Sequence, residues 1–534
     1  MKKQIVNIIN FVRGTEPRYP ADLLGTMQKQ MEELKRLGLK GTFLFQYDAL
    51  NDASFVQTAK LYSGLFEFGL WIELTRGCVL AAGEAWRGRD QEWDWRGNIC
   101  NTVGYTPKSR KRLTDAAMSK FKEAFGYFPK SVGAWAIDAV TLGHLEKKYN
   151  ISAACNCKEQ WGTDGYTLWG GYYGQGYYPS KYNSLCPAQT DAAQINIPVF
   201  RMLGSDPVYQ YDAGLNISGA ASECQPVITL EPVYTGESGF THVGNSSGGG
   251  GVPGWVDWYF KENFNGKCLS FGYAQAGQEN SFGWDAMKGG WLYQMEKIKR
   301  LSESGELSVM TLGETGEWYK NNFKSTPPSA ITAESDWKGL NRKSNWYCCK
   351  NYRANLFFDG NAFWLRDFFL FDENYKERYL DKICETEGYV FDNLPIIDGN
   401  RWSGNGIRAG IYPVDLKSGG PVLASGAPVW TESGGTAVVI IPTARFGSIT
   451  ITFSEDGITV SVEKNGGDNL ILKPLFNTAV ADVQTKLLDN NTLRFTYYGH
   501  KYALKLSVGK LIAARGGFEM YTENGNMRLN AEIF

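Results

Sequence analysis

Histidine is scarce in this chain: only His144, His242 and His500 occur among 534 residues. No HxxxH or HExxH motif is present, so a catalytic metal site built on histidine is not expected. No G-x-S-x-G motif leads into a predicted helix, and no Gly-Lys-Ser/Thr follows the glycine run at 246–251. A Ser-His-Asp triad and a phosphate-binding P-loop are therefore poorly supported, and chemistry based on carboxylates remains.

Other absences exclude other classes of protein. Lys and Arg (55) nearly balance Asp and Glu (56), so nothing indicates binding to nucleic acid or to an anionic membrane surface. No apolar run approaches the ~20 residues of a membrane span. Ten cysteines in a chain of this size do not form a disulfide scaffold. The apolar run at 5–12 is too short for a signal peptide, so we expect a cytoplasmic protein, or a periplasmic or secreted one if a signal was removed.

The first 320 residues alternate strand and helix signals, a pattern typical of a mainly parallel sheet. Predicted strands lie at 4–12, 41–46, 68–74, 132–138, 151–155, 197–203, 268–274 and 307–312. We therefore predict an α/β barrel of seven or eight strands over residues 1–325, serving as the catalytic domain.

The pattern changes after the Pro-containing segment at 324–329. Hairpins are predicted at 356–365, 451–460 and 520–529, where Asp-Gly or Asn-Gly supplies the positive φ angles of a tight turn. We predict an all-β sandwich domain over residues 326–534.

Carboxylates follow most of the predicted barrel strands, at the edge where such barrels bind ligands. Each has a structural alternative: Asp138 could cap a helix, and Glu16 and Arg18 could form a loop salt bridge. Their recurrence from strand to strand favours a site. The segment 161–183 adds a loop rich in Trp, Tyr and Gly, which could stack on sugar rings or pack on itself as a small core.

The segments 133–142 and 147–154 resemble the glycoside hydrolase/deacetylase superfamily, and the strands at 4–12 and 41–45 fit the same pattern. The segment 200–211 is similar to uncharacterised bacterial members. The resemblance implies an irregular β/α barrel, commonly followed by a β-rich domain. Deacetylases of this group bind a metal through an Asp and an HxxxH motif that this chain lacks. Metal-free retaining members place a nucleophile after the fourth strand and an acid after the seventh, which by position are Asp138 and Glu279.

We therefore predict a carbohydrate-active enzyme, a metal-independent glycoside hydrolase without a cofactor, acting on an oligosaccharide or glycoside. Asp138 would be the nucleophile or base and Glu279 the acid, with Glu73 and Asp206 in reserve. The predicted substrate-binding residues are Glu16, Arg18, Asp48, Trp86, Trp135, Trp161, Asp164, Trp169 and Tyr209. The alternatives are a non-catalytic carbohydrate-binding protein on the same barrel, a polysaccharide deacetylase or a lyase. The sugar, the linkage and the oligomeric state stay open.

Overall fold

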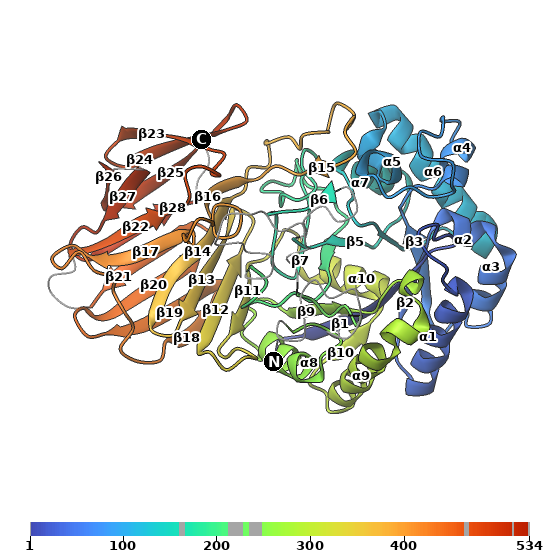
Figure 1. Ribbon diagram of the computed structural model, residues 1–534, viewed down its shortest axis with the longest axis horizontal. Helices are drawn as coiled ribbons and strands as arrows, with labels where there is room; N and C mark the ends of the chain where they lie inside the picture. The colour runs from blue at the N-terminus through green and yellow to red at the C-terminus, as the bar shows by residue number, and fades with distance from the viewer. Residues whose placement is uncertain are drawn as a thin grey trace.

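The computed structural model describes residues 2–159, 166–211, 228–233, 248–463, 469–514 and 517–531. It contains an α/β barrel followed by two antiparallel sheets. In Figure 1 the barrel lies on the right and the two sheets lie on the left. Within these ranges, no helix is long and apolar enough to cross a membrane.

Eight parallel strands form the nearly closed barrel, and all eight were predicted from the sequence. Strand β1 forms parallel pairs with three strands, β2, β9 and β10. Strand β5 pairs with β8. A hydrogen bond from Gly204 N to Gln275 O (3.2 Å) joins the end of β8 to β9. The strands are β1 (Gln4–Val12), β2 (Thr42–Phe45), β3 (Glu67–Trp71), β4 (Ser131–Gly133), β5 (Ala153–Cys157), β8 (Val199–Met202), β9 (Gly272–Ala276) and β10 (Ser308–Met310).

Helices with one apolar face cover most of the barrel. Helix α1 begins at the N-cap Asp22, buries Met27, Met31 and Leu34, and ends at Gly38 in the left-handed conformation. The helices are α1 (Leu23–Leu37), α2 (Tyr47–Asn51), α3 (Ala53–Lys60), α4 (Arg76–Ala81), α5 (Gly97–Cys100), α6 (Pro107–Phe125), α7 (Ala139–Lys148), α8 (Pro253–Asn263), α9 (Trp284–Glu303) and α10 (Leu312–Asn322), with 3₁₀ turns η1 (Thr102–Gly104) and η3 (Asn280–Phe282).

The C-terminal part is a sandwich of two antiparallel sheets, as predicted. The first contains β11 (Ser329–Ala333), β12 (Arg342–Cys348), β13 (Tyr352–Asp359), β14 (Ala362–Leu370), β16 (Leu394–Asp398), β17 (Gly410–Asp415), β22 (Leu470–Leu475), β26 (Lys510–Ala514) and β27 (Gly517–Tyr521). The second contains β18 (Val429–Ser433), β19 (Thr436–Thr443), β20 (Gly447–Ser454), β21 (Gly457–Val462), β23 (Gln484–Asp489), β24 (Thr492–Tyr497), β25 (His500–Val508) and β28 (Asn526–Asn530).

Two of the three predicted hairpins are confirmed, namely β13 with β14 and β20 with β21. The third, at 520–529, is wrong. Asn524 and Gly525 do form a turn with positive φ angles (49° and 72°), but β27 then pairs within the first sheet and β28 within the second. The turn carries the chain from one layer of the sandwich to the other.

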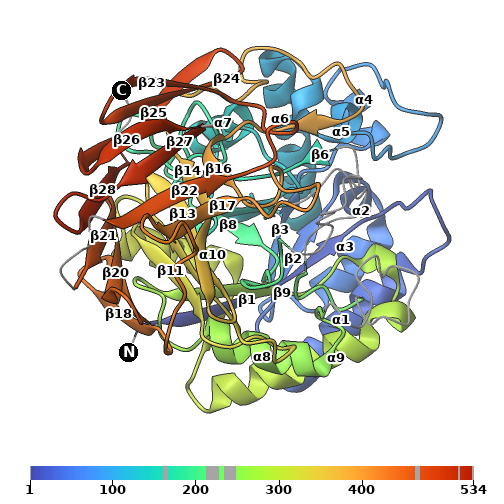
Figure 2. The same ribbon diagram turned by 60° about the vertical axis from the view of Figure 1, so that its left-hand side comes forward.

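Strands β12 and β13 of the first sheet are buried on both faces over most of their length, because this part of the sheet lies between the barrel and the second sheet (Figure 2). Side chains on successive residues of a strand point to opposite faces. Trp346 and Phe357 accordingly belong to the core shared with the barrel, whereas Tyr347 and Phe358 belong to the core of the sandwich.

The barrel wall beside this sheet has no helix between β5 and β8 in the described residues. Short strands and loops fill the space, including β7 (Gly176–Tyr177) and β6 (Tyr166–Thr167), which pairs with β15 (Tyr389–Val390) of the C-terminal part. Loop carbonyls need donors where no helix satisfies them. Arg201, on β8, supplies them by donating to the carbonyls of Cys157, Gly170 and Tyr172.

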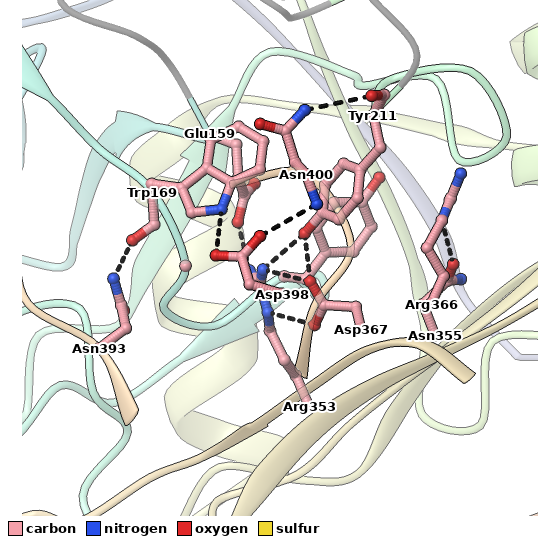
Figure 3. A network of polar contacts seen from close by, with 12 residues as sticks. Glu159, Trp169, Tyr211, Arg353, Asn355, Arg366, Asp367, Asn393, Asp398 and Asn400 are labelled. Atoms are coloured by element: carbon pink, nitrogen blue, oxygen red, sulfur yellow. Dashed lines mark hydrogen bonds and ion pairs between the residues drawn. The ribbon is translucent and has the colours of Figure 1, made fainter. Parts of the chain in front are cut away.

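A buried ion cluster joins the two parts of the chain at this wall (Figure 3). Arg353 of β13 binds Glu159, which follows β5, and makes two hydrogen bonds with Asp367 of β14 (3.0 and 2.9 Å). Arg353 also donates to the Tyr211 hydroxyl (2.6 Å) and the Gly171 carbonyl (3.0 Å). The barrel and the first sheet are therefore joined by charges that water does not reach.

Replacing Arg353→Met should destabilise the whole protein by about 3–5 kcal/mol, because Glu159 and Asp367 would stay buried without their cation. Chemical denaturation with barrel and sandwich fluorescence probes measures this loss. The matched control is Arg36→Met on α1, where a 54% exposed arginine pairs with Glu33 and a change below about 1 kcal/mol is expected. Equal effects of the two substitutions would contradict the account.

Candidate active site

The carboxyl end of the barrel carries a layer of polar and aromatic side chains set by the two-residue period of the strands. Ile9, Phe11, Leu44 and Trp71 point into the barrel, where they form one apolar cluster with Trp135. Continuing the same alternation one step beyond the strands brings Arg13, Gln46 and Glu73 to the top of this interior. Side chains from β1, β2, β3 and β4 thus meet at one end of the barrel.

Arg13 lies at the centre of this layer and contacts three carboxylates through three different nitrogens. Nη1 lies 3.2 Å from Glu16, Nη2 lies 3.0 Å from Glu73, and Nε lies 3.5 Å from Glu279. The Arg13 side chain is 1% exposed. Two carboxyls on one guanidinium lie within roughly 10 Å of each other, the range occupied by glycosidase acid pairs. Glu73 and Glu279, both predicted catalytic residues, are therefore brought together.

The two carboxyls have different partners. Glu73 accepts hydrogen bonds from Trp71 Nε1 (3.0 Å) and Gln46 Nε2 (3.5 Å) in addition to Arg13. Glu279 accepts a hydrogen bond from the Ser281 hydroxyl on Oε1, whereas its Oε2 accepts none from the part of the chain that the structure describes. Glu73 is thus held by several donors, and Glu279 keeps an oxygen that a ligand could bind.

Aromatic rings line the interior beside these groups. Trp135 packs on Phe11 and Trp71 with ring centroids 5.2 and 5.0 Å apart. Trp135 is 8% exposed, yet its Nε1 has no hydrogen-bond partner in the described ranges. A buried donor without a partner is costly, so this indole is a candidate to donate to a bound ligand. The predicted substrate contact of Trp135 stays a prediction.

Arg18, Glu16 and Trp93 hold Arg13 from the solvent side. Arg18 donates to Glu16 through Nε (2.8 Å) and Nη2 (2.6 Å), and the Trp93 ring lies 4.2 Å from the Arg13 guanidinium and 4.7 Å from that of Arg18. Burial would raise the pKa of Glu16, but the hydrogen bonds and charges of Arg18 and Arg13 hold it below its ordinary value. Glu16 therefore stays ionised. The loop salt bridge that was the structural alternative for Glu16 and Arg18 is present, and their predicted substrate binding stays a prediction.

Asp138 has a separate set of partners. It caps α7 by accepting from Thr141 N (3.1 Å), and it binds Arg110 (3.2 Å) and the hydroxyl of Thr102. Burial favours its neutral form, but Arg110 and these hydrogen bonds keep the pKa of Asp138 below its ordinary value. Within the described residues, no hydrogen bond or ion pair joins Asp138 to Glu279. The contacts are those of the structural alternative, a helix cap, and a catalytic role for Asp138 stays a prediction.

Glu377 of the C-terminal part lies beside Asp138. It accepts hydrogen bonds from Ala139 N (3.0 Å) and Ser184 N (2.9 Å). Burial, together with the neighbouring charge of Asp138, raises the pKa of Glu377 to about 7.

Asp206 and Asp48 also hold structural contacts. Asp206 accepts from Tyr209 N (2.7 Å) and from Trp255 Nε1 (2.8 Å), and burial raises its pKa to about 6. Asp48 accepts from the Thr75 hydroxyl (2.6 Å), and burial likewise raises its pKa to about 6. The Asp206 bonds hold the turn after β8, and the Asp48 bond joins α2 to Thr75, the N-cap of α4.

The other predicted aromatic residues bind partners outside the Arg13 layer or are not described. Trp169 donates to Asp398 (3.1 Å, Figure 3), and the Tyr209 hydroxyl donates to Asp336 (2.6 Å). Trp86 donates to the Arg89 carbonyl (2.8 Å). In the Gly-rich loop, Tyr173 stacks on Trp346 of the first sheet at 3.7 Å, which favours the packing alternative for this loop. Trp161 and Asp164 lie outside the described residues.

Sequence reasoning did not single out Arg13, Gln46, Trp71, Trp93 or Ser281 as site residues. The two-residue alternation could have found the first three, because each continues an inward series of its strand. Trp93 lies in a loop and Ser281 in the short 3₁₀ turn η3, where the two-residue period of a strand does not apply. Among the residues that the structure describes, no group of three or more His, Cys, Asp and Glu side chains is arranged to hold a metal ion.

Residues 96–339, less than half of the chain, match the family described as a domain of unknown function with a solved structure, DUF3863. No curated protein matches the chain.

Among solved structures, a provisionally named glycoside hydrolase/deacetylase from Parabacteroides distasonis is 16% identical, with a TM-score of 0.51 over 73% of this chain and 90% of that one. A provisionally named polysaccharide deacetylase from Mycobacterium smegmatis is 12% identical, with a TM-score of 0.34 over 60% and 91% of the two chains. The alpha-amylase AmyC from Thermotoga maritima is 9% identical, with a TM-score of 0.31 over 61% and 76%. The first of these likenesses confirms, at the level of the fold, the predicted resemblance to glycoside hydrolase/deacetylase barrels.

Replacing Glu377→Gln should change how stability depends on pH. The folded state keeps a proton on Glu377 up to about pH 7, whereas the unfolded chain loses it near pH 4.3. Its contribution to the free energy of unfolding therefore falls as pH rises through this window, by at most about 1.4 kcal/mol per unit. The variant should lose that part of the slope in urea titrations between pH 5 and 7.5. An unchanged slope would contradict this assignment.

Proposed function

We propose that the protein is a carbohydrate-active enzyme, a glycoside hydrolase that uses Glu73 and Glu279 as its pair of carboxyl groups. The observation that carries the proposal is the contact of both carboxyls with the single guanidinium of Arg13, at the end of the barrel where such folds bind ligands. The fold supports the broader assignment, because the Parabacteroides distasonis protein, which has a similar fold at 16% identity, is provisionally named a glycoside hydrolase/deacetylase.

The different environments of the two carboxyls support different roles. Donors from Arg13, Trp71 and Gln46 favour the charged form of Glu73, as a nucleophile or base requires. Glu279 has fewer hydrogen-bond partners: its Oε2 accepts no hydrogen bond in the described residues and lies 3.5 Å from Arg13 Nε as an ion pair. We therefore assign Glu279 as the acid.

The reaction follows from these roles. The Glu279 carboxyl gives its proton to the glycosidic oxygen as the bond from that oxygen to the anomeric carbon breaks. Glu73 either bonds to the anomeric carbon, and water later replaces it, or removes a proton from the attacking water. A separation of about 5–5.5 Å between the carboxyls favours the first course, and roughly 6.5–9.5 Å favours the second. In both courses, the aromatic rings beside the site would contact the sugar.

Deacetylation of a carbohydrate is the second candidate, because the name of the same structural neighbour includes a deacetylase. The two reactions release different products. Chromatography of a digest of acetylated oligosaccharides separates them, since a hydrolase shortens the chain and a deacetylase releases acetate from chains of unchanged length.

Glu73→Gln and Glu279→Gln should each lower kcat/KM on alkyl glycosides at least a thousandfold. With a dinitrophenyl leaving group, which needs no protonation, Glu279→Gln should recover most of its activity and Glu73→Gln should not. Steady-state kinetics on both substrate types measure the difference.

The control is Asp138→Asn, an equally conservative change in a buried carboxylate of the same barrel. It is expected to lower stability, because it weakens the contact with Arg110, while leaving most of kcat in the folded fraction. If Asp138→Asn abolishes turnover and Glu73→Gln does not, the nucleophile is Asp138 and the proposed pair is wrong.

A further inference from the structure

We infer that Arg13 is the positioning residue of this site: its guanidinium fixes the relative placement of Glu73 and Glu279 and keeps Glu73 charged. The inference deepens the proposed function and rests on it. Arg13 acts through the two carboxyls, because its guanidinium contacts both of them.

The guanidinium geometry suits this task. Its N–H donors form a rigid planar fork, unlike the single rotating ammonium of lysine. Glu16, Glu73 and Glu279 each take a different nitrogen of this fork. The three carboxylates follow β1, β3 and β9, so one rigid group relates three separate strand ends.

The backbone of Arg13 is tied to the residue next to Glu279. Arg13 N donates to Asn280 Oδ1 (2.8 Å), and Asn280 Nδ2 donates to the Arg13 carbonyl (2.9 Å). The same residue of β1 therefore contacts Glu279 through its side chain and the adjacent Asn280 through its main chain. This double contact fixes the end of β1 against η3, which begins directly after the acid Glu279.

The guanidinium is itself held from outside. The Trp93 ring lies 4.2 Å from it, and Glu16 connects it to Arg18, whose side chain is 25% exposed. Charges therefore alternate from solvent to the interior through Arg18, Glu16, Arg13 and Glu73. Removing Arg13 would leave three neighbouring carboxylates without their shared cation, and like charges favour protonation of at least one of them.

Arg13→Met is therefore expected to move the titration of Glu73 to higher pH by about one to three units. ¹³C NMR of glutamate-labelled protein, with Glu73 assigned by comparison with Glu73→Gln, measures this shift without any substrate. The acidic limb of the kcat/KM profile should move upward with it. Arg13→Lys, which keeps the charge and loses the fork, should shift the titration less while still lowering kcat.

The matched control is Arg110→Met, which removes another fully buried arginine paired with a carboxylate, Asp138. A merely structural arginine would give the same result at both positions: lower thermal stability, with the Glu73 titration and the pH profile unmoved. That result at Arg13 would overturn the inference. Should Arg13→Met unfold, Arg13→Lys carries the same test, because an unmoved titration with wild-type kcat would also overturn it.

The outcome separates this inference from the proposed function. If Glu73→Gln and Glu279→Gln keep wild-type turnover, the proposed pair is wrong, whatever the NMR titration reports. If both lose turnover while the Glu73 titration in Arg13→Met stays at its wild-type pH, the pair stands and the role of Arg13 is wrong. Movement of the titration together with loss of turnover supports both.

Discussion

The barrel wall between β5 and β8, which has no helix in the residues that the structure describes, is the constraint on which the rest of the molecule depends. A parallel barrel needs both faces of its strands covered, and here the first sheet of the sandwich provides the cover. The charges of Arg353, Glu159 and Asp367 are sealed at this contact without water. Such a cluster adds little net stability when complete, but breaking it is costly. It therefore makes the correct docking of barrel and sandwich specific.

This docking also shapes the end of the barrel where the carboxylates lie. Arg366 of β14 donates to the Val208 carbonyl (2.8 Å), and Trp346 donates to the Pro207 carbonyl (3.0 Å). The loop after β8 is thus held by the C-terminal part, while the loops after β1, β3 and β9 are held together by Arg13. Two buried arginines, Arg366 at the loop after β8 and Arg13 at the loops after β1, β3 and β9, therefore organise the loops from which a ligand site at this end would be built.

The barrel strands and the two-sheet sandwich could be predicted because apolar periods of two and 3.6 residues, with Gly and Pro at the turns, are local signals. It was harder to predict from the sequence which strand-end carboxylates belong to the candidate site and which have structural roles. Asp138 and Glu73 both follow a strand, but a helix begins directly after Asp138, and its carboxylate caps that helix. Glu73 lies one step of the inward alternation beyond Trp71. The grouping of Glu73 with Glu279 depends on Arg13 and on closure of β1 against β9, which are contacts between distant segments. The turn at Asn524–Gly525 likewise signals a reversal but not which sheet receives the next strand.

The most direct test of the central claim is a crystal structure with a bound iminosugar or oligosaccharide. The account predicts that the anomeric carbon, or the iminosugar nitrogen, lies within about 3.5 Å of a Glu73 oxygen, as in a near-attack geometry, with Glu279 facing the leaving-group oxygen. A sugar bound against Asp138, or outside the ring of Arg13, Glu73, Trp135 and Glu279, would contradict it.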